Sequence, residues 1–411
     1  MEKINPVMTI EEILKNYPQT FDVFVANGFN VASREELLEL AGNDTMIQSI
    51  LKVRGINVDI FINALREKVF TKGLDEDLVD KFHDENSTLN LLGKIPCPLR
   101  ILFKDMLGEA IKDYKEKTGI TLNCYIPSGC GDKYEYEDIC SLENIDELPD
   151  IILTKGFDDF HRKNFIDKFV KKGYFKSVFT DNLDDRFLEA GCLDNDYTMY
   201  ASFLDVMLID EKNLGDLPKP KTWSDLLNPI YKDKIITFGM PEGISTVTPI
   251  YLYKEHGVES IAKFAHNVKG AYHGAKMAKV AGTNSKEAGA IYILPLFFAK
   301  TCIREGLSIL WPEDGAILYP FCMLVKESKM EEMKYLIDFI TKDFGQVCAK
   351  SHGIALNPDI KNTNIPKDGK LKWIGWNYIK SKDVIELGDY IRKEFEIEWQ
   401  KKNSSEDKRI V

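Results

Sequence analysis

The hydrophobic pattern of the chain changes near residue 89. Upstream of this point apolar residues recur at helical spacing, most clearly in the segment 58–69. We therefore predict that residues 1–75 form a small all-helical domain of four or five short helices. The polar stretch that follows is typical of a linker, which we place at 76–88.

Downstream of residue 89, short apolar runs alternate with amphipathic stretches. The segment 89–155 contains a strand-like run, an amphipathic helix that ends at Gly119, and two further strand-like runs. Strands and helices in this order indicate crossover connections and a parallel sheet. Two β-rich runs, at 197–211 and 315–325, are longer than a typical strand. The sequence therefore predicts an α/β fold that follows an all-α domain.

Size and charge narrow the class of protein. The chain has 411 residues, a length that suits two or three domains. It contains 54 basic and 65 acidic residues, so the formal net charge is −11. An acidic chain without a basic block argues against nucleic acid or an anionic membrane as the main partner.

No targeting or membrane-spanning segment is predicted. Acidic residues and Pro6 interrupt the start of the chain, where a secretory signal would need an unbroken apolar stretch. No apolar run approaches the ~18 residues of a membrane span. We therefore expect a cytoplasmic protein.

The eight cysteines are scattered, and none forms a C-x-x-C pair. This spacing predicts neither a disulfide framework nor a structural zinc site. We therefore expect no metal site and no cofactor. One alternative is a metal or cluster held by cysteines, because Cys97, Cys124 and Cys130 follow neighbouring strand-like runs.

Four phrases of the sequence, in this order, resemble the type II periplasmic substrate-binding proteins of ABC transporters, in particular the ferric-iron-binding branch. They are TWSDLLNPIYKDKI, AGAIYILP, SILWPEDGAILYPFCMLVK and YLIDFITKDFGQ. The resemblance covers roughly residues 89–360. It implies two α/β lobes that are joined by two crossing hinge strands and hold a ligand between them.

The resemblance also implies where the lobes lie along the chain. The crossing strands would fall near 200–210 and 315–325. Lobe 1 would then comprise 89–200 and 320–411, and lobe 2 would comprise 201–319.

The N-terminal segment MTIEEILKNYPQTFDVFVANGFN resembles a small helical domain of unknown function that is often found beside redox and hybrid-cluster proteins. Members commonly carry a cysteine motif after the second helix. This chain has GFNVASREE at that position, without a cysteine. The missing cysteine argues against a redox role for this domain, and we hypothesise that it is a protein-docking module instead.

Two departures from the ferric-binding pattern affect the expected ligand. Ferric-binding members place adjacent tyrosines after the strand equivalent to AGAIYILP, where this chain has Leu296, Phe297 and Phe298. These side chains offer no oxygen to a hard cation such as Fe³⁺. We therefore predict no classical ferric site. The family also normally carries an export signal, which makes its members extracytoplasmic.

Cys97 is the first candidate site residue, because it lies between two prolines where a strand-like run gives way to a helix. Pro98 suits the first turn of that helix. A helix N-terminus favours an anion and lowers the pKa of a thiol. Arg100 in the same turn has a guanidinium group that can bind a carboxylate or phosphate. Simple packing of the thiol and solvation of the arginine remain the alternatives.

The other candidate ligand-binding residues come from loops that follow predicted strands or from positions that the family pattern places near the ligand. They are Ser128, Gly129, Lys155, Tyr200, Gly243, Ser245, Thr246, Tyr292 and Asp314. Each has a structural alternative, which is a turn, an edge lysine, a helix cap or a core aromatic.

The resemblance implies a non-enzymatic solute-binding protein, of the ABC transporter type or a cytosolic sensor derived from it. We expect it to close by hinge motion on a small polar solute, either an anion or a metal complex. Its expected partners are this solute and either an ABC permease or a protein that docks on residues 1–75. The alternative is an enzyme on the same scaffold with Cys97 as nucleophile.

Overall fold

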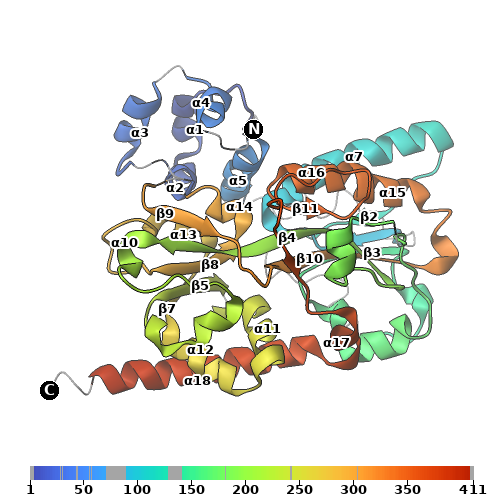
Figure 1. The fold of residues 1–411 in the computed structure, drawn as a ribbon. Helices are drawn as coiled ribbons and strands as arrows, with labels where there is room; N and C mark the ends of the chain where they lie inside the picture. The colour runs from blue at the N-terminus through green and yellow to red at the C-terminus, as the bar shows by residue number, and fades with distance from the viewer. Residues whose placement is uncertain are drawn as a thin grey trace.

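The computed structural model shows a helical domain above a large α/β body (Figure 1). It describes residues 4–27, 29, 31–42, 45–54, 56, 58–70, 89–127, 141–180, 182–240, 243–302 and 304–407.

The N-terminal domain is all-helical, as the sequence predicts. Its helices are α1 (Ile10–Asn16), α2 (Phe21–Ala26), α3 (Arg34–Ala41), α4 (Ile47–Val53) and α5 (Val58–Phe70). They enclose a hydrophobic core of their own, in which the rings of Phe24, Phe29 and Phe61 contact one another. This segment therefore has the independent core that a domain requires.

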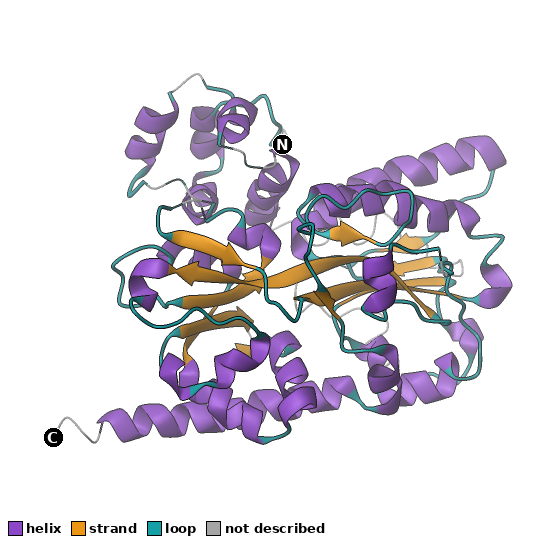
Figure 2. Cartoon of the chain, in the orientation of Figure 1, coloured by secondary structure: helices purple, strands orange, loops and turns teal. Residues whose placement is uncertain are grey.

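The α/β body is built on one mixed sheet (Figure 2). Its path runs β2-β1-β3-β10-β4-β8-β5-β6, with β7 on β5, β9 and β11 on β4, and β12 on β10. The strands are β1 (Leu91–Gly93), β2 (Cys124–Tyr125), β3 (Ile151–Lys155), β4 (Tyr197–Asp210), β5 (Ile235–Met240), β6 (Gly243–Ile244), β7 (Val268–Tyr272), β8 (Ile291–Pro295), β9 (Leu307–Leu310), β10 (Ala316–Val325), β11 (Ile354–Ala355) and β12 (Leu371–Lys372).

Two strands join the lobes, which confirms the predicted fold. All 14 residues of β4 are buried, and its first half pairs with β10 and β11. Its second half pairs with β8 and β9. Antiparallel β10 runs beside β4 and continues into the first lobe, where it pairs with β3. A strand this long can serve two lobes because each half has its own neighbours.

Helices cover both faces of the sheet. The long helix α7 (Cys97–Thr118) lies on one face, which we call the α7 face, and ends at Gly119 in a left-handed conformation. The opposite face carries the C-terminal helix α18 (Val384–Asp407), and we call it the α18 face.

The remaining helices are short. They are α8 (Lys163–Phe165), α9 (Asp185–Glu189), α10 (Glu211–Leu214), α11 (Val247–His256), α12 (Glu259–Asn267), α13 (Gly274–Val280), α14 (Leu296–Ala299), α15 (Lys334–Asp338), α16 (Gly345–Lys350) and α17 (Trp376–Ser381). Among the described residues, none of the helices is both long enough and apolar enough to cross a bilayer.

Helix α18 belongs to both lobes by its contacts. The sequence placed 320–411 in the first lobe, but α18 packs against α11 and α12 of the second. The indole of Trp399 donates a hydrogen bond to the Val268 carbonyl (3.0 Å), and the buried Lys402 Nζ donates to the same oxygen (2.7 Å). The predicted domain boundaries stay predictions.

The N-terminal domain also contacts both lobes. Helix α5 packs against α7 of the first lobe, where Arg66 Nη1 lies 3.9 Å from Asp105 Oδ2. Helix α2 packs against α13 of the second lobe. The domain therefore straddles the junction of the lobes on the α7 face (Figure 1).

Candidate functional site

Several predicted site residues lie where the first lobe meets the crossing strands on the α7 face. Cys97 begins α7, with Pro98 in its first turn, and Arg100 is buried one turn along. The side chains of Cys97 and Pro98 lie outside the described part of the structure. Lys155 ends β3 opposite Phe321, and side chains of paired residues share a face. Because the carboxyl ends of strands hold ligands in open α/β sheets, this corner is a candidate site.

Asp205 lies on the same face, in the middle of the crossing strand β4. It pairs with Ile317 of β10 and with Pro295 at the end of β8. Its neighbour Phe203 stacks on Phe297, with ring centroids 5.7 Å apart. Burial raises the pKa of the Asp205 carboxyl to about 7.

Sequence reasoning overlooked Asp205, although a signal was present. It is a charged residue inside the apolar run YTMYASFLDVMLID, which forms β4. Asp and Glu are rarely buried unless they are paired or functional. A lone carboxylate in a buried strand is therefore a marker that sequence reading can use.

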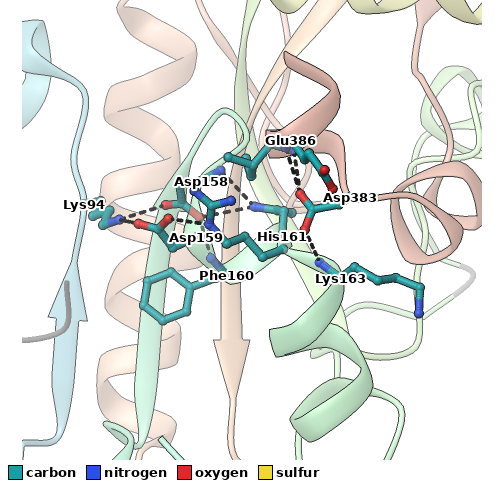
Figure 3. A network of polar contacts seen from close by, with 10 residues as sticks. Lys94, Asp158, Asp159, Phe160, His161, Lys163, Asp383 and Glu386 are labelled. Atoms are coloured by element: carbon teal, nitrogen blue, oxygen red, sulfur yellow. Dashed lines mark hydrogen bonds and ion pairs between the residues drawn. The ribbon is translucent and has the colours of Figure 1, made fainter. Parts of the chain in front are cut away.

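A polar network occupies the strand ends of the first lobe (Figure 3). Lys94 follows β1, and its Nζ lies 3.6 Å from both Asp158 Oδ2 and Asp159 Oδ2. The fully buried His161 places Nδ1 3.2 Å from Asp158 Oδ1, and its ring stacks on Tyr197. This network fixes the loop after β3.

Charge in this network overcomes desolvation. Burial alone would raise the pKa of Asp158, but Lys94, His161 and the Phe160 N–H together hold it below its usual range. The network also reaches α18, because Asp383 accepts from the N–H groups of Lys163 (3.1 Å) and Glu386 (2.9 Å). These contacts give the network a structural role.

The predicted loop of the second lobe lies against α18. Gly243 has a φ of 125°, and a Cβ there would lie 3.1 Å from the Arg392 side chain. Thr246 precedes α11 without capping it through its side chain, and it faces Gly388 of α18. Ser245 donates its N–H to the Phe238 carbonyl (2.8 Å). Ligand binding by this loop stays a prediction.

A pocket of about 530 Å³ lies beside this loop, between the edge strand β7 and α18. Its lining includes Gly243, Lys269, His273, Glu396 and Trp399. His273 is exposed there, and its ring contacts Phe298. Of the predicted site residues, Gly243 reaches this pocket.

Three predicted residues have structural surroundings. Tyr200 is fully buried against Phe321 and Phe344. Tyr292 is also buried, and its hydroxyl accepts a hydrogen bond from the Gly289 N–H (2.9 Å). Asp314 forms an ion pair with Lys372 (2.8 Å). Their role in ligand binding stays a prediction without support from these contacts.

Ser128 and Gly129 lie outside the described residues, as does Cys130. Cys124, Cys192, Cys322 and Cys348 are buried, and burial raises the pKa of each thiol. In the described ranges, no three His, Cys, Asp or Glu side chains come together in a way that could hold a metal ion.

Comparison with protein families identifies two segments. A family described as bacterial extracellular solute-binding protein matches residues 146–382. A domain of unknown function matches residues 4–62. No curated protein is similar enough in sequence to be counted as a relative.

Solved structures share the fold at low identity. A ferric binding protein from Campylobacter jejuni is 15% identical, with 75% of this chain and 99% of that chain covered and a TM-score of 0.51. An ABC transporter protein from Clostridium perfringens is also 15% identical, with the same coverage and a TM-score of 0.50. At this identity the likeness shows the fold alone.

Proposed function

The chain belongs to the bacterial extracellular solute-binding proteins, and we propose that it captures a small polar solute between its lobes and closes over it by hinge motion. Proteins of this kind bind solutes and are not catalysts. The observation that carries the proposal is the pair of strands, β4 and β10, that each serve both lobes. A solute that contacts both lobes favours their closed arrangement.

The site that we propose lies on the α7 face at the junction of the lobes. The N-terminus of α7, Arg100 and Lys155 are the features that support an anionic group or a metal complex as the ligand. The proposed partners are a permease of the ABC transporter type and a protein that docks on the N-terminal helices.

Native mass spectrometry of the purified chain tests this proposal. We expect the protein to retain a small solute that denaturation releases, and we expect Lys155→Met to reduce the retained fraction. Lys350→Met, an exposed lysine of the same lobe on α16, is the matched control. A wild-type protein that retains no solute, and whose thermal unfolding no polar solute shifts, contradicts the proposal.

A further inference from the structure

Asp205 is a buried carboxylate for which the described residues supply no hydrogen-bond or ion-pair partner. Only 7% of its surface is exposed. Within the described part of the chain, neither a hydrogen bond nor an ion pair reaches its side chain. An isolated buried carboxylate costs several kcal/mol, so a partner from outside the chain would satisfy it.

Asp210, at the end of the same strand, shows the usual treatment of a buried carboxylate. It accepts hydrogen bonds from Asn213 Nδ2 (2.7 Å), the Asn213 N–H (3.1 Å) and the Gly282 N–H (2.9 Å). These donors are supplied by neighbouring turns. The described residues therefore supply hydrogen-bond donors to the carboxylate at one end of β4 but not to Asp205.

Aromatic rings and a lysine lie on the same face of the sheet as Asp205. Lys155 pairs with Phe321, which pairs with Ala201 of β4, and Phe203 pairs with Tyr319. Paired residues share a face and alternate residues of a strand point to the same side, so Lys155, Phe203 and Tyr319 lie on the face of Asp205. Ala201, in line with Lys155, and Asp205 are four residues apart along β4, a distance of about 13 Å. Among the described residues, Lys155 has no ion pair either. In the described ranges, a carboxyl group and a lysine ammonium group without ion-pair partners thus flank aromatic rings.

We propose that Asp205 contacts a cationic centre of the bound solute, either an organic ammonium or the metal of a complex, while Lys155 faces its anionic group. The solute class is therefore a small molecule that carries both charges. This inference rests on the proposed function and refines it from an anion or metal complex to a ligand with a cationic centre at the crossing strand.

Four probes of simple chemistry test this assignment by thermal shift on the full chain. They are 1,4-diaminobutane, 4-aminobutanoate, butanedioate and ferric citrate. The first three have the same four-carbon length and differ in the charges at their ends. The variants are Asp205→Asn and Lys155→Met, with the exposed Asp359→Asn as the matched control.

We expect 4-aminobutanoate or ferric citrate to raise Tm by about 3 °C or more at millimolar concentration. Asp205→Asn and Lys155→Met should each abolish this shift, and Asp359→Asn should keep it. A shift with 4-aminobutanoate identifies an ammonium as the cationic centre, and a shift with ferric citrate identifies a metal.

Two results would overturn the assignment. Butanedioate that stabilises the wild type and Asp205→Asn equally would leave the proposed function intact but remove Asp205 from the ligand. A solute that co-purifies without any cationic centre or metal would do the same. If no probe binds and no solute co-purifies, the proposed function fails together with this inference.

Discussion

Asp158 and Asp205 are two buried carboxylates whose surroundings shift their pKa in opposite directions. Asp158 has Lys94 and His161 beside it, so its charged form is favoured in the folded state. Burial is the cause of the pKa shift of Asp205, so its neutral form is favoured until the pH reaches about 7. The two residues should therefore affect stability with opposite dependence on pH.

Asp205→Asn should stabilise the protein more at pH 8 than at pH 5. The folded-state pKa of Asp205 lies above its unfolded value, so the wild type loses stability as pH rises from about 4 to about 7. Asn removes this penalty, which is at most about 4 kcal/mol. Thermal unfolding at both pH values measures the effect. An equal change in Tm at pH 5 and pH 8 would contradict it.

Asp158→Asn should destabilise the protein at pH 7, and this loss should shrink as the pH falls below about 3.9. The lowered folded-state pKa gives stability above the unfolded value of about 3.9, and this stability is lost as the carboxylate is protonated. Removing one partner of a buried ion pair costs about 3–5 kcal/mol. Urea unfolding at pH 7 measures it. Asp159→Asn is the control, because this more exposed neighbour should cost less.

At the scale of elements, periodicity predicted most helices and strands but not what they cover. The long apolar runs correctly indicated β4 and β10, because burial on both faces leaves an uninterrupted run. The amphipathic pattern of α18 predicted which side of the helix is buried, but it did not predict which elements the helix packs against. Its packing on α12 depends on Trp399 and Lys402 meeting a carbonyl that lies 131 or more positions away.

Lys402→Met should loosen the C-terminal half of α18. It removes the ion pair with Asp233 and the hydrogen bond to Val268 O, at a cost of about 1–3 kcal/mol in the free energy of unfolding. Amide exchange in β7 should become faster. Lys401→Met is the matched control, because this exposed lysine pairs only within α18, with Glu398, and should change stability by about 0.5 kcal/mol or less. Equal effects of the two variants would refute the predicted role of Lys402.

At the scale of the molecule, the sequence predicted two lobes and a helical domain but not their mutual arrangement. The candidate site was likewise predictable from the sequence only in part. Lys155 could be named from a strand end and Arg100 from the first turn of a helix. The pairing of Phe203 with Tyr319 and of Asp205 with Ile317 required the register of β4 and β10. Register depends on long-range contacts that no local pattern specifies.

The attachment of the N-terminal domain can be tested at Asp105. Asp105→Lys places a second positive charge near Arg66, so amides of α5 should exchange severalfold faster while the Tm of the lobes stays within about 1 °C. Hydrogen exchange with mass spectrometry measures both helices. Glu109→Lys, an exposed position one turn further along α7, should leave α5 unchanged. Unchanged exchange in both variants would show that this ion pair does not hold the domain.

Helix α18 constrains how the molecule can open. Asp383, at its beginning, holds the first lobe through Lys163, and Lys402, near its end, holds the second. Because α18 is bound to both lobes, we expect the lobes to stay together on the α18 face and to separate on the α7 face. If a solute binds at Asp205 as we propose, it would enter on the α7 face, where the N-terminal helices α2 and α5 contact the two lobes (Figure 1).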